Sequence, residues 1–153
     1  MHLKRIMVIG VLLVLISCQA QQAPDDFLPS VEYLTSDSTL EFGFSEAVRV
    51  GHMLYLSGKL GSNESTNTLV PGGIKAETKQ TMENIKRTLE KYGSSLGRVV
   101  KCTVMLADIR EWDDMNSVYI TYFPEHLPAR SAFGTSGLAL GARVEIECWA
   151  TVD

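Results

Sequence analysis

The chain has 153 residues, of which 45% are hydrophobic and 21% charged, and its formal net charge is −4. This length predicts one domain rather than several. No run of five or more basic residues occurs, which argues against a nucleic-acid partner, because such binding depends on Lys and Arg side chains that neutralise phosphates.

The first 17 residues have the pattern of a signal peptide. Two basic residues precede an uncharged run from Ile6 to Ser17, which is shorter than the roughly 20 residues that a membrane-spanning helix needs. The run ends in LISC at residues 15–18, which is similar to a bacterial lipobox, a signal whose Cys is lipidated and begins the mature protein. We therefore expect residues 1–17 to be removed and Cys18 to be lipidated. The alternative is a secretory signal cut at another small residue.

Lipidation of Cys18 would hold the protein at a bilayer, because acylation contributes roughly 0.8 kcal/mol per buried CH₂ group. Gln19 follows the cysteine, and this resembles sorting to the outer membrane in a Gram-negative cell. The expected location is the bacterial cell envelope, on the periplasmic side of the outer membrane in such a cell. Residues 18–29 are predicted to form a flexible tether and residues 30–153 the folded domain. Without residues 1–17, 12 basic residues face 18 acidic ones, a net charge of −6.

The first half of the domain predicts a hairpin, a loop and a helix. EAVRV (46–50) and MLYLSG (53–58) flank the turn residues Gly51 and His52, which indicates two antiparallel strands. A polar loop is expected over residues 62–73. Apolar residues at helical spacing then predict a helix over residues 74–92, followed by Gly93 where a helix usually stops. These residues are Met82, Ile85, Leu89 and Tyr92.

The second half predicts a strand, a helix and two more strands. RVVKCTVML (98–106) is the strand, and Asp108 with Glu111 resembles an N-terminal capping pair. An apolar stripe marks the second helix, which Pro124 ends: Trp112, Met115, Tyr119, Tyr122 and Phe123. The last strands are expected over residues 130–137 and 142–152. This order predicts an α+β fold, in which a single mostly antiparallel sheet carries two helices on one face.

Two cysteines, Cys102 and Cys148, lie on the apolar faces of predicted strands. The favoured interpretation is two small buried hydrophobic side chains, and the alternative is a disulfide in an oxidising compartment. The sequence contains no C-x-x-C or His-x-x-x-His pattern, so we predict no metal site.

The sheet face turned away from the helices is predicted to be partly covered. Trp149 and Met105 share this face with charged residues such as Glu145 and Glu147. No third helix is available to cover them, so we expect a second copy of the chain to do so. Arg130 and Glu147 are then expected near a subunit boundary.

Four blocks of the sequence resemble successive blocks of the Rid (YjgF-type, RidA-like) family. They are FSEAVRVGHMLYLSGKLG from residue 44, QTMENIKRTLEKYGSSLGRVVKCTVMLADIREWDDMNSVYITYF from residue 80, PARSAFG from residue 128 and GARVEIECWA from residue 141. The resemblance covers roughly residues 29–153. It implies the α+β fold of a bacterial type of chorismate mutase, a homotrimer with clefts between subunits, and no metal or organic cofactor.

The resemblance also implies an activity, the hydrolytic deamination of reactive 2-imino and enamine acids to 2-ketoacids and ammonia. Arg130 would hold the substrate carboxylate by paired charge-assisted hydrogen bonds. Glu147 would orient or deprotonate the attacking water. Ser57, Gly58 and Asn116 would bind the substrate's other groups.

Three further substrate-binding candidates depart from the family's pattern. Phe44, Lys59 and Ala132 stand where active members commonly carry Tyr, Gln and Cys. Phe44 removes a hydroxyl, Lys59 adds a charge that would favour a more anionic ligand, and Ala132 could still act through its backbone.

Two other functions remain as alternatives. The first is a non-catalytic receptor for a small carboxylate, which would use the same Arg130 cleft at the cell envelope. The second is a ribonuclease, an activity sometimes attributed to the family. The acidic chain, with no basic track and no pair of catalytic histidines, makes a ribonuclease the weakest of these readings.

Overall fold

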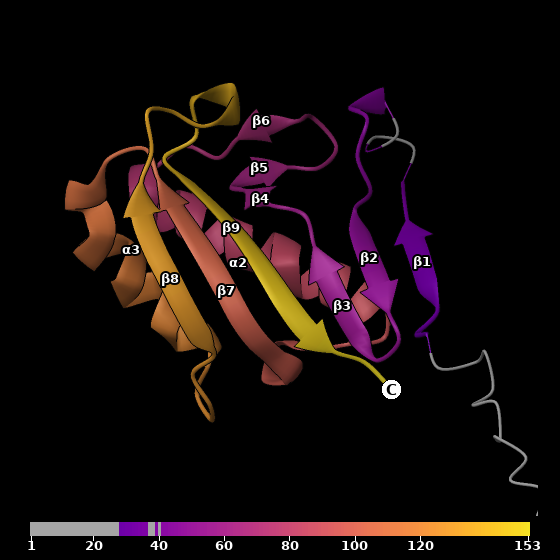
Figure 1. Ribbon diagram of the computed structural model, residues 1–153. Coiled ribbons are helices and arrows are strands. Elements are labelled where there is room, and N and C mark those ends of the chain that lie inside the picture. Colours follow the sequence, from indigo (N-terminus) through magenta and orange to yellow (C-terminus); the bar gives the residue numbers. More distant parts are fainter. Residues whose placement is uncertain (1–27, 37–38, 40) are drawn as a thin grey trace, which may run out of the picture.

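Seven strands form one sheet (Figure 1). They are β1 (Val31–Leu34), β2 (Ala47–Val50), β3 (Met53–Leu56), β4 (Lys59–Leu60), β7 (Val99–Leu106), β8 (Ala129–Gly134) and β9 (Val144–Thr151). The order is β1-β2-β3-β9-β7-β8, with β4 also paired to β9. Among the strands that the structure describes, only β7 and β8 pair in parallel. This computed structural model describes residues 28–36, 39 and 41–153, so the predictions for residues 1–17, for Cys18 and for most of the tether lie outside the described residues.

Two helices, α2 (Gly73–Lys91) and α3 (Trp112–Tyr119), lie on one side of the sheet (Figure 1). Short 3₁₀ turns occur at Leu96–Arg98, Ile109–Glu111, Ile120–Tyr122 and Ala139–Gly141. The predicted α+β arrangement is confirmed, as are the hairpin of β2 and β3 and both helical regions. No helix in the described part of the chain is long and apolar enough to cross a membrane.

The core lies between the helices and the sheet, because each element buries one face there. Alternate residues of β9 are buried, from Val144 to Ala150, as the two-residue period of a strand requires. The helix α2 contributes the predicted stripe of Met82, Ile85 and Leu89, which are fully buried. The intervening residues of β9 therefore lie on the open face of the sheet.

Four features differ from the sequence predictions. The strands β1 and β4 were not expected, and the polar loop contains a small hairpin of β5 (Ser62–Asn63) and β6 (Thr68–Leu69). These strands have two to four residues, too few to show a period. The second helix is shorter than expected. Asp108 accepts a hydrogen bond from the Arg110 backbone N–H at 3.0 Å, as a cap does, whereas the Glu111 side chain binds Arg143 instead.

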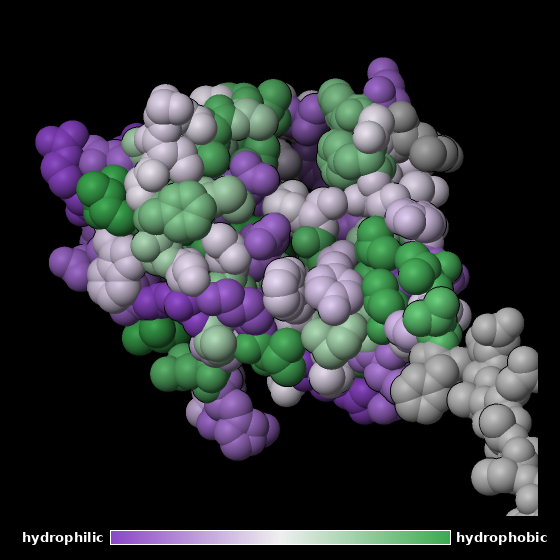
Figure 2. All heavy atoms as spheres, in the orientation of Figure 1, coloured by the Kyte–Doolittle hydropathy of each residue, from purple (hydrophilic) through white to green (hydrophobic). Residues whose placement is uncertain are grey.

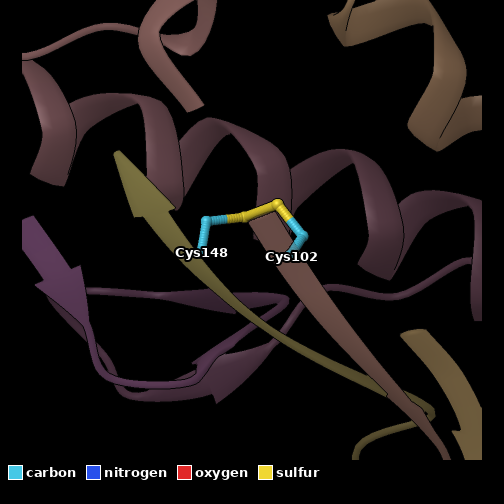
Figure 3. The surroundings of a disulfide bond; sticks show 2 residues. All are labelled: Cys102 and Cys148. Atoms are coloured by element: carbon cyan, nitrogen blue, oxygen red, sulfur yellow. A yellow bond between two sulfur atoms is a disulfide. The ribbon is translucent and has the colours of Figure 1, made fainter. Parts of the chain in front are cut away.

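Cys102 and Cys148 form a disulfide (Figure 3), so the favoured interpretation of two separate thiols was wrong. The two residues are direct cross-strand partners of β7 and β9, and their Cα atoms lie 4.2 Å apart. Adjacent antiparallel strands bring such partners to about this spacing. The sequence placed both cysteines on apolar faces but did not give the register that sets them opposite each other.

Candidate active site

Arg130 lies on the edge strand β8 and points towards α3. Its Nη1 donates a hydrogen bond to Asn116 Oδ1 at 2.7 Å. The guanidinium carbon also lies 5.2 Å from the ring centre of Trp112 and 4.8 Å from that of Tyr119. These helix residues are spaced by four and three positions, so they share one face of α3. The structure thus brings together two predicted site residues, Arg130 and Asn116.

Arg130 has no carboxylate partner among the described residues, whereas each of the other arginines that the structure describes does. Those pairs are Arg49–Glu32, Arg87–Glu64, Arg98–Asp153, Arg110–Asp108 and Arg143–Glu111. A guanidinium has five N–H donors, and Asn116 takes one from Arg130. A half-buried cation of this kind can accept an anion from outside the chain.

The turn between β3 and β4 holds Ser57 and Gly58. The Ser57 hydroxyl donates to the Ser45 carbonyl at 2.7 Å. A Cβ atom added at Gly58 would lie only 1.9 Å from Glu145 Oε1, so the carboxylate of Glu145 packs directly against the Gly58 backbone. Only glycine permits this approach. This contact makes Glu145 a further candidate for the site.

Glu145 and Glu147 lie side by side on the open face of β9. Burial, together with the neighbouring charge of Glu147, raises the pKa of Glu145. A pKa raised by burial and a neighbouring charge is one mark of a carboxyl group suited to acid–base chemistry. The sequence does not identify Glu145 as a site residue, because it does not show which residue of the last strand contacts Gly58.

Lys59 shares one carboxylate, that of Glu46, with a second cation, Lys91. Its Nζ lies 3.2 Å from Glu46 Oε1, and Lys91 Nζ lies 2.7 Å from Oε2. Burial raises the pKa of Glu46, but hydrogen bonds from Lys91 and Tyr92 and the charge of Lys59 lower it to about 2. One carboxylate between two ammonium groups leaves a net positive charge beside the turn, so the preference for a more anionic ligand stays a prediction.

A cavity of about 700 Å³ adjoins this turn. Phe44, Gly58 and Lys59 line it together with residues of α2 such as Arg87 and Lys91. The Phe44 ring is 46% exposed. Three of the predicted binding residues therefore meet at one hollow.

The predicted site residues form two separate groups. The first group is Arg130, Asn116 and Ala132, and Ala132 lies two residues from Arg130 on the same side of β8. The second group is Phe44, Ser57, Gly58 and Lys59, which the structure extends by Glu145. The strands β7 and β9 separate β8 from β3 and β4, and Glu147 lies on the open face while Arg130 points to α3. One protomer therefore does not bring Arg130 to Glu147.

Within the described part of the chain, no cluster of three or more His, Cys, Asp or Glu side chains could hold a metal ion. The candidate residues offer a guanidinium, carboxylates, an ammonium group, a hydroxyl and backbone amides.

Comparisons with known proteins agree on one family. A family model described as Endoribonuclease L-PSP matches residues 37–152. The chain is 43% identical to a 2-iminobutanoate/2-iminopropanoate deaminase of Rattus norvegicus over 104 residues, which cover 68% of this chain and 76% of the rat protein. The solved structure of RidA from the Antarctic bacterium Psychrobacter sp. PAMC 21119 is 39% identical with a TM-score of 0.69, and the match covers 72% of this chain and 89% of that one. The crystal structure of a yeast protein, YEO7, is 35% identical with a TM-score of 0.72, over 81% of this chain and 100% of that one.

Proposed function

Because the chain belongs to the Rid/YjgF/RutC family, which the Endoribonuclease L-PSP model represents, we propose that it hydrolyses 2-imino acids to 2-ketoacids and ammonia. The observation that carries the proposal is Arg130, a half-buried guanidinium with no carboxylate partner among the described residues. A 2-imino acid supplies the missing carboxylate. The planar guanidinium can bind both of its oxygens.

A carboxylate on the open face serves as the general base. Water adds to the carbon of the protonated imine and passes one proton to this base, and the product is a neutral carbinolamine. The proton then moves to nitrogen, the C–N bond breaks with release of ammonia, and the hydroxyl loses its proton as the carbonyl forms. The resemblance placed this role on Glu147. Glu145 is better situated, since its carboxylate packs against Gly58 and its pKa is raised.

The complete site is proposed to form between subunits of a homotrimer. The Arg130 group and the Gly58 group lie on strands that β7 and β9 separate, so a second copy must bring them together. The open face supports this arrangement, because Trp149 and Phe133 are 39% and 46% exposed there. Figure 2 views the sheet from the side opposite α2 and shows apolar and polar residues interspersed over it.

Ammonia release from freshly generated 2-iminopropanoate tests the activity, with spontaneous hydrolysis measured in parallel. Two charge-assisted bonds contribute roughly 1.5–3 kcal/mol each, so Arg130→Ala should lower kcat/KM at least about a hundredfold. The control is Arg110→Ala, which removes an exposed guanidinium paired with Asp108 and should change nothing. A wild-type chain that binds 2-oxobutanoate but releases no ammonia above the background would instead be a carboxylate receptor.

The envelope location stays a proposal, and the disulfide supports it. Structural disulfides persist in oxidising compartments outside the cytoplasm, and both cysteines of this disulfide are fully buried. If Cys18 carries the lipid, Cys18→Ala should move the protein from the membrane fraction to the soluble one. Equal membrane association of both forms would rule out the lipid anchor.

A further inference from the structure

The groups that hold Arg130 are all neutral. They are the amide oxygen of Asn116 and the rings of Trp112 and Tyr119. We propose that Trp112 and Tyr119 are positioning residues, which fix the Arg130 guanidinium for a carboxylate ligand without cancelling its charge. This inference rests on the proposed function, because it concerns how the same arginine binds a 2-imino or 2-keto acid.

An aromatic ring and a carboxylate can both fix a guanidinium, but only the carboxylate cancels its charge. The Glu111 carboxylate fixes Arg143, and the Asp108 carboxylate fixes Arg110, but each also neutralises its partner. A ring attracts the cation through its quadrupole and carries no net charge. A carboxylate ligand therefore meets no competing anion from the described residues at Arg130, and the unused N–H donors remain available to it.

Tyr119 contributes its ring rather than its hydroxyl. The side chain is only 2% exposed, and its hydroxyl oxygen has no hydrogen-bond partner among the described residues. Burial raises the pKa of Tyr119 to about 12, although the charge of Arg130 lowers it. The phenol therefore stays protonated over the whole physiological range and never supplies an anion to Arg130.

The backbone on both sides of this cluster is well fixed. Arg130 lies opposite Cys102 in the parallel pair of β8 and β7, and the disulfide ties Cys102 to β9. On the helix side, the Tyr119 ring also packs on Phe123, with 5.0 Å between ring centres. The position of the guanidinium is thus set by rigid elements, as binding of a ligand in one orientation requires.

The test compares Trp112→Leu, Trp112→Phe and the wild-type full chain. Trp112 is chosen because it is only half-buried, so its replacement endangers folding less than a change at Tyr119. Two readouts are needed: the dissociation constant of 2-oxobutanoate from titration calorimetry, and kcat and KM for 2-iminopropanoate. Tyr122→Leu is the matched control, since this aromatic side chain follows α3 and donates to Glu83 instead.

Loss of the Trp112 ring should weaken 2-oxobutanoate binding about five- to thirtyfold and raise KM by a similar factor, with kcat nearly unchanged. Trp112→Phe restores an aromatic face and should recover most of the affinity, whereas Tyr122→Leu should bind like the wild type. A merely structural role would lower kcat through loss of folded protein and leave KM unaltered. A lowered kcat with unaltered KM, or wild-type affinity for 2-oxobutanoate in Trp112→Leu, would overturn this inference but not the proposed function. A wild-type chain that neither binds nor deaminates overturns the proposed function as well.

Discussion

The role of Arg130 depends on the absence of a carboxylate beside it among the described residues. Six arginines are described, and five of them face a carboxylate. The sixth faces the amide of Asn116 at 2.7 Å. An acid at that position would give Arg130 an internal ion pair and remove its reason to bind a ligand.

The substitution Asn116→Asp tests this directly, because it adds a charge with almost no change of shape. We expect the affinity for 2-oxobutanoate to fall at least about tenfold, since the ligand must displace an internal carboxylate. The melting temperature should stay the same or rise. The control is Asn116→Ala, which removes the hydrogen bond without adding charge and should weaken binding less. Equal losses in both variants would contradict the electrostatic argument.

Glu46 shows how a single buried carboxylate can couple stability to pH. It accepts hydrogen bonds from Lys59, Thr88, Lys91 and Tyr92. These donors join β4 and the end of α2 to the segment that carries Glu46. Together they outweigh the effect of burial and hold the pKa of Glu46 at about 2, below its usual 4.5.

Stability should therefore depend on the ionised form of Glu46. A lowered folded-state pKa means that the contribution is complete above pH 4.5 and is lost as the pH falls towards 2. Glu46→Gln should destabilise the protein by roughly 1–3 kcal/mol at pH 7 and flatten the dependence of the unfolding free energy between those two pH values. Urea denaturation at several pH values measures both effects. If the unfolding free energy of Glu46→Gln depends on acid pH as that of the wild type does, other carboxylates cause this dependence.

At the scale of elements, the sequence predicts what is local and periodic. The stripe from Met82 to Leu89 identifies α2, and the alternation along Val144–Thr151 identifies β9 and both of its faces. The contacts of Glu145 with Gly58 and of Lys59 with Glu46 link residues 87 and 13 positions apart. Such contacts depend on register and on which strands are neighbours, and neither is encoded in the period of one element.

The disulfide is the clearest case of such dependence on register. It joins the central strands β7 and β9 and closes a loop across a sequence separation of 46 residues. Loop-closure entropy for this length corresponds to roughly 4 kcal/mol of stabilisation. Cys102→Ala with Cys148→Ala should therefore lower the free energy of unfolding by about 2–4 kcal/mol.

Guanidinium denaturation of the oxidised wild type and the double variant gives this difference. Because both cysteines are fully buried, thiol titration of the native protein should find neither of them before or after mild reductant treatment. Reactivity without denaturant would mean that the strands open locally. A double variant as stable as the wild type would leave the disulfide without a stabilising role.

At the scale of the whole molecule, the open face of the sheet is unusual for a surface exposed to water. Trp149 contacts Tyr55 edge to face at 5.2 Å between ring centres. Phe133, on β8 towards the other end of the same face, is 46% exposed. Glu145 and Glu147 lie among these rings on β9. Exposed apolar surface often belongs to an interface, and symmetric closed assemblies are the commonest kind, which agrees with the proposed trimer.

Assembly and activity should therefore fail together when this face is altered. With residues 1–17 removed and Cys18 replaced by Ala, the chain should sediment at three times its protomer mass. Trp149→Glu places a charge in the proposed interface and should shift the protein to monomer at micromolar concentration, with loss of deaminase activity and no change in far-ultraviolet circular dichroism. The matched control is Ile120→Glu, since Ile120 is 45% exposed but follows α3 on the helix-bearing side. If Trp149→Glu is a monomer with full activity, the complete site lies within one protomer. If Trp149→Glu is still a trimer, the interface does not include this face.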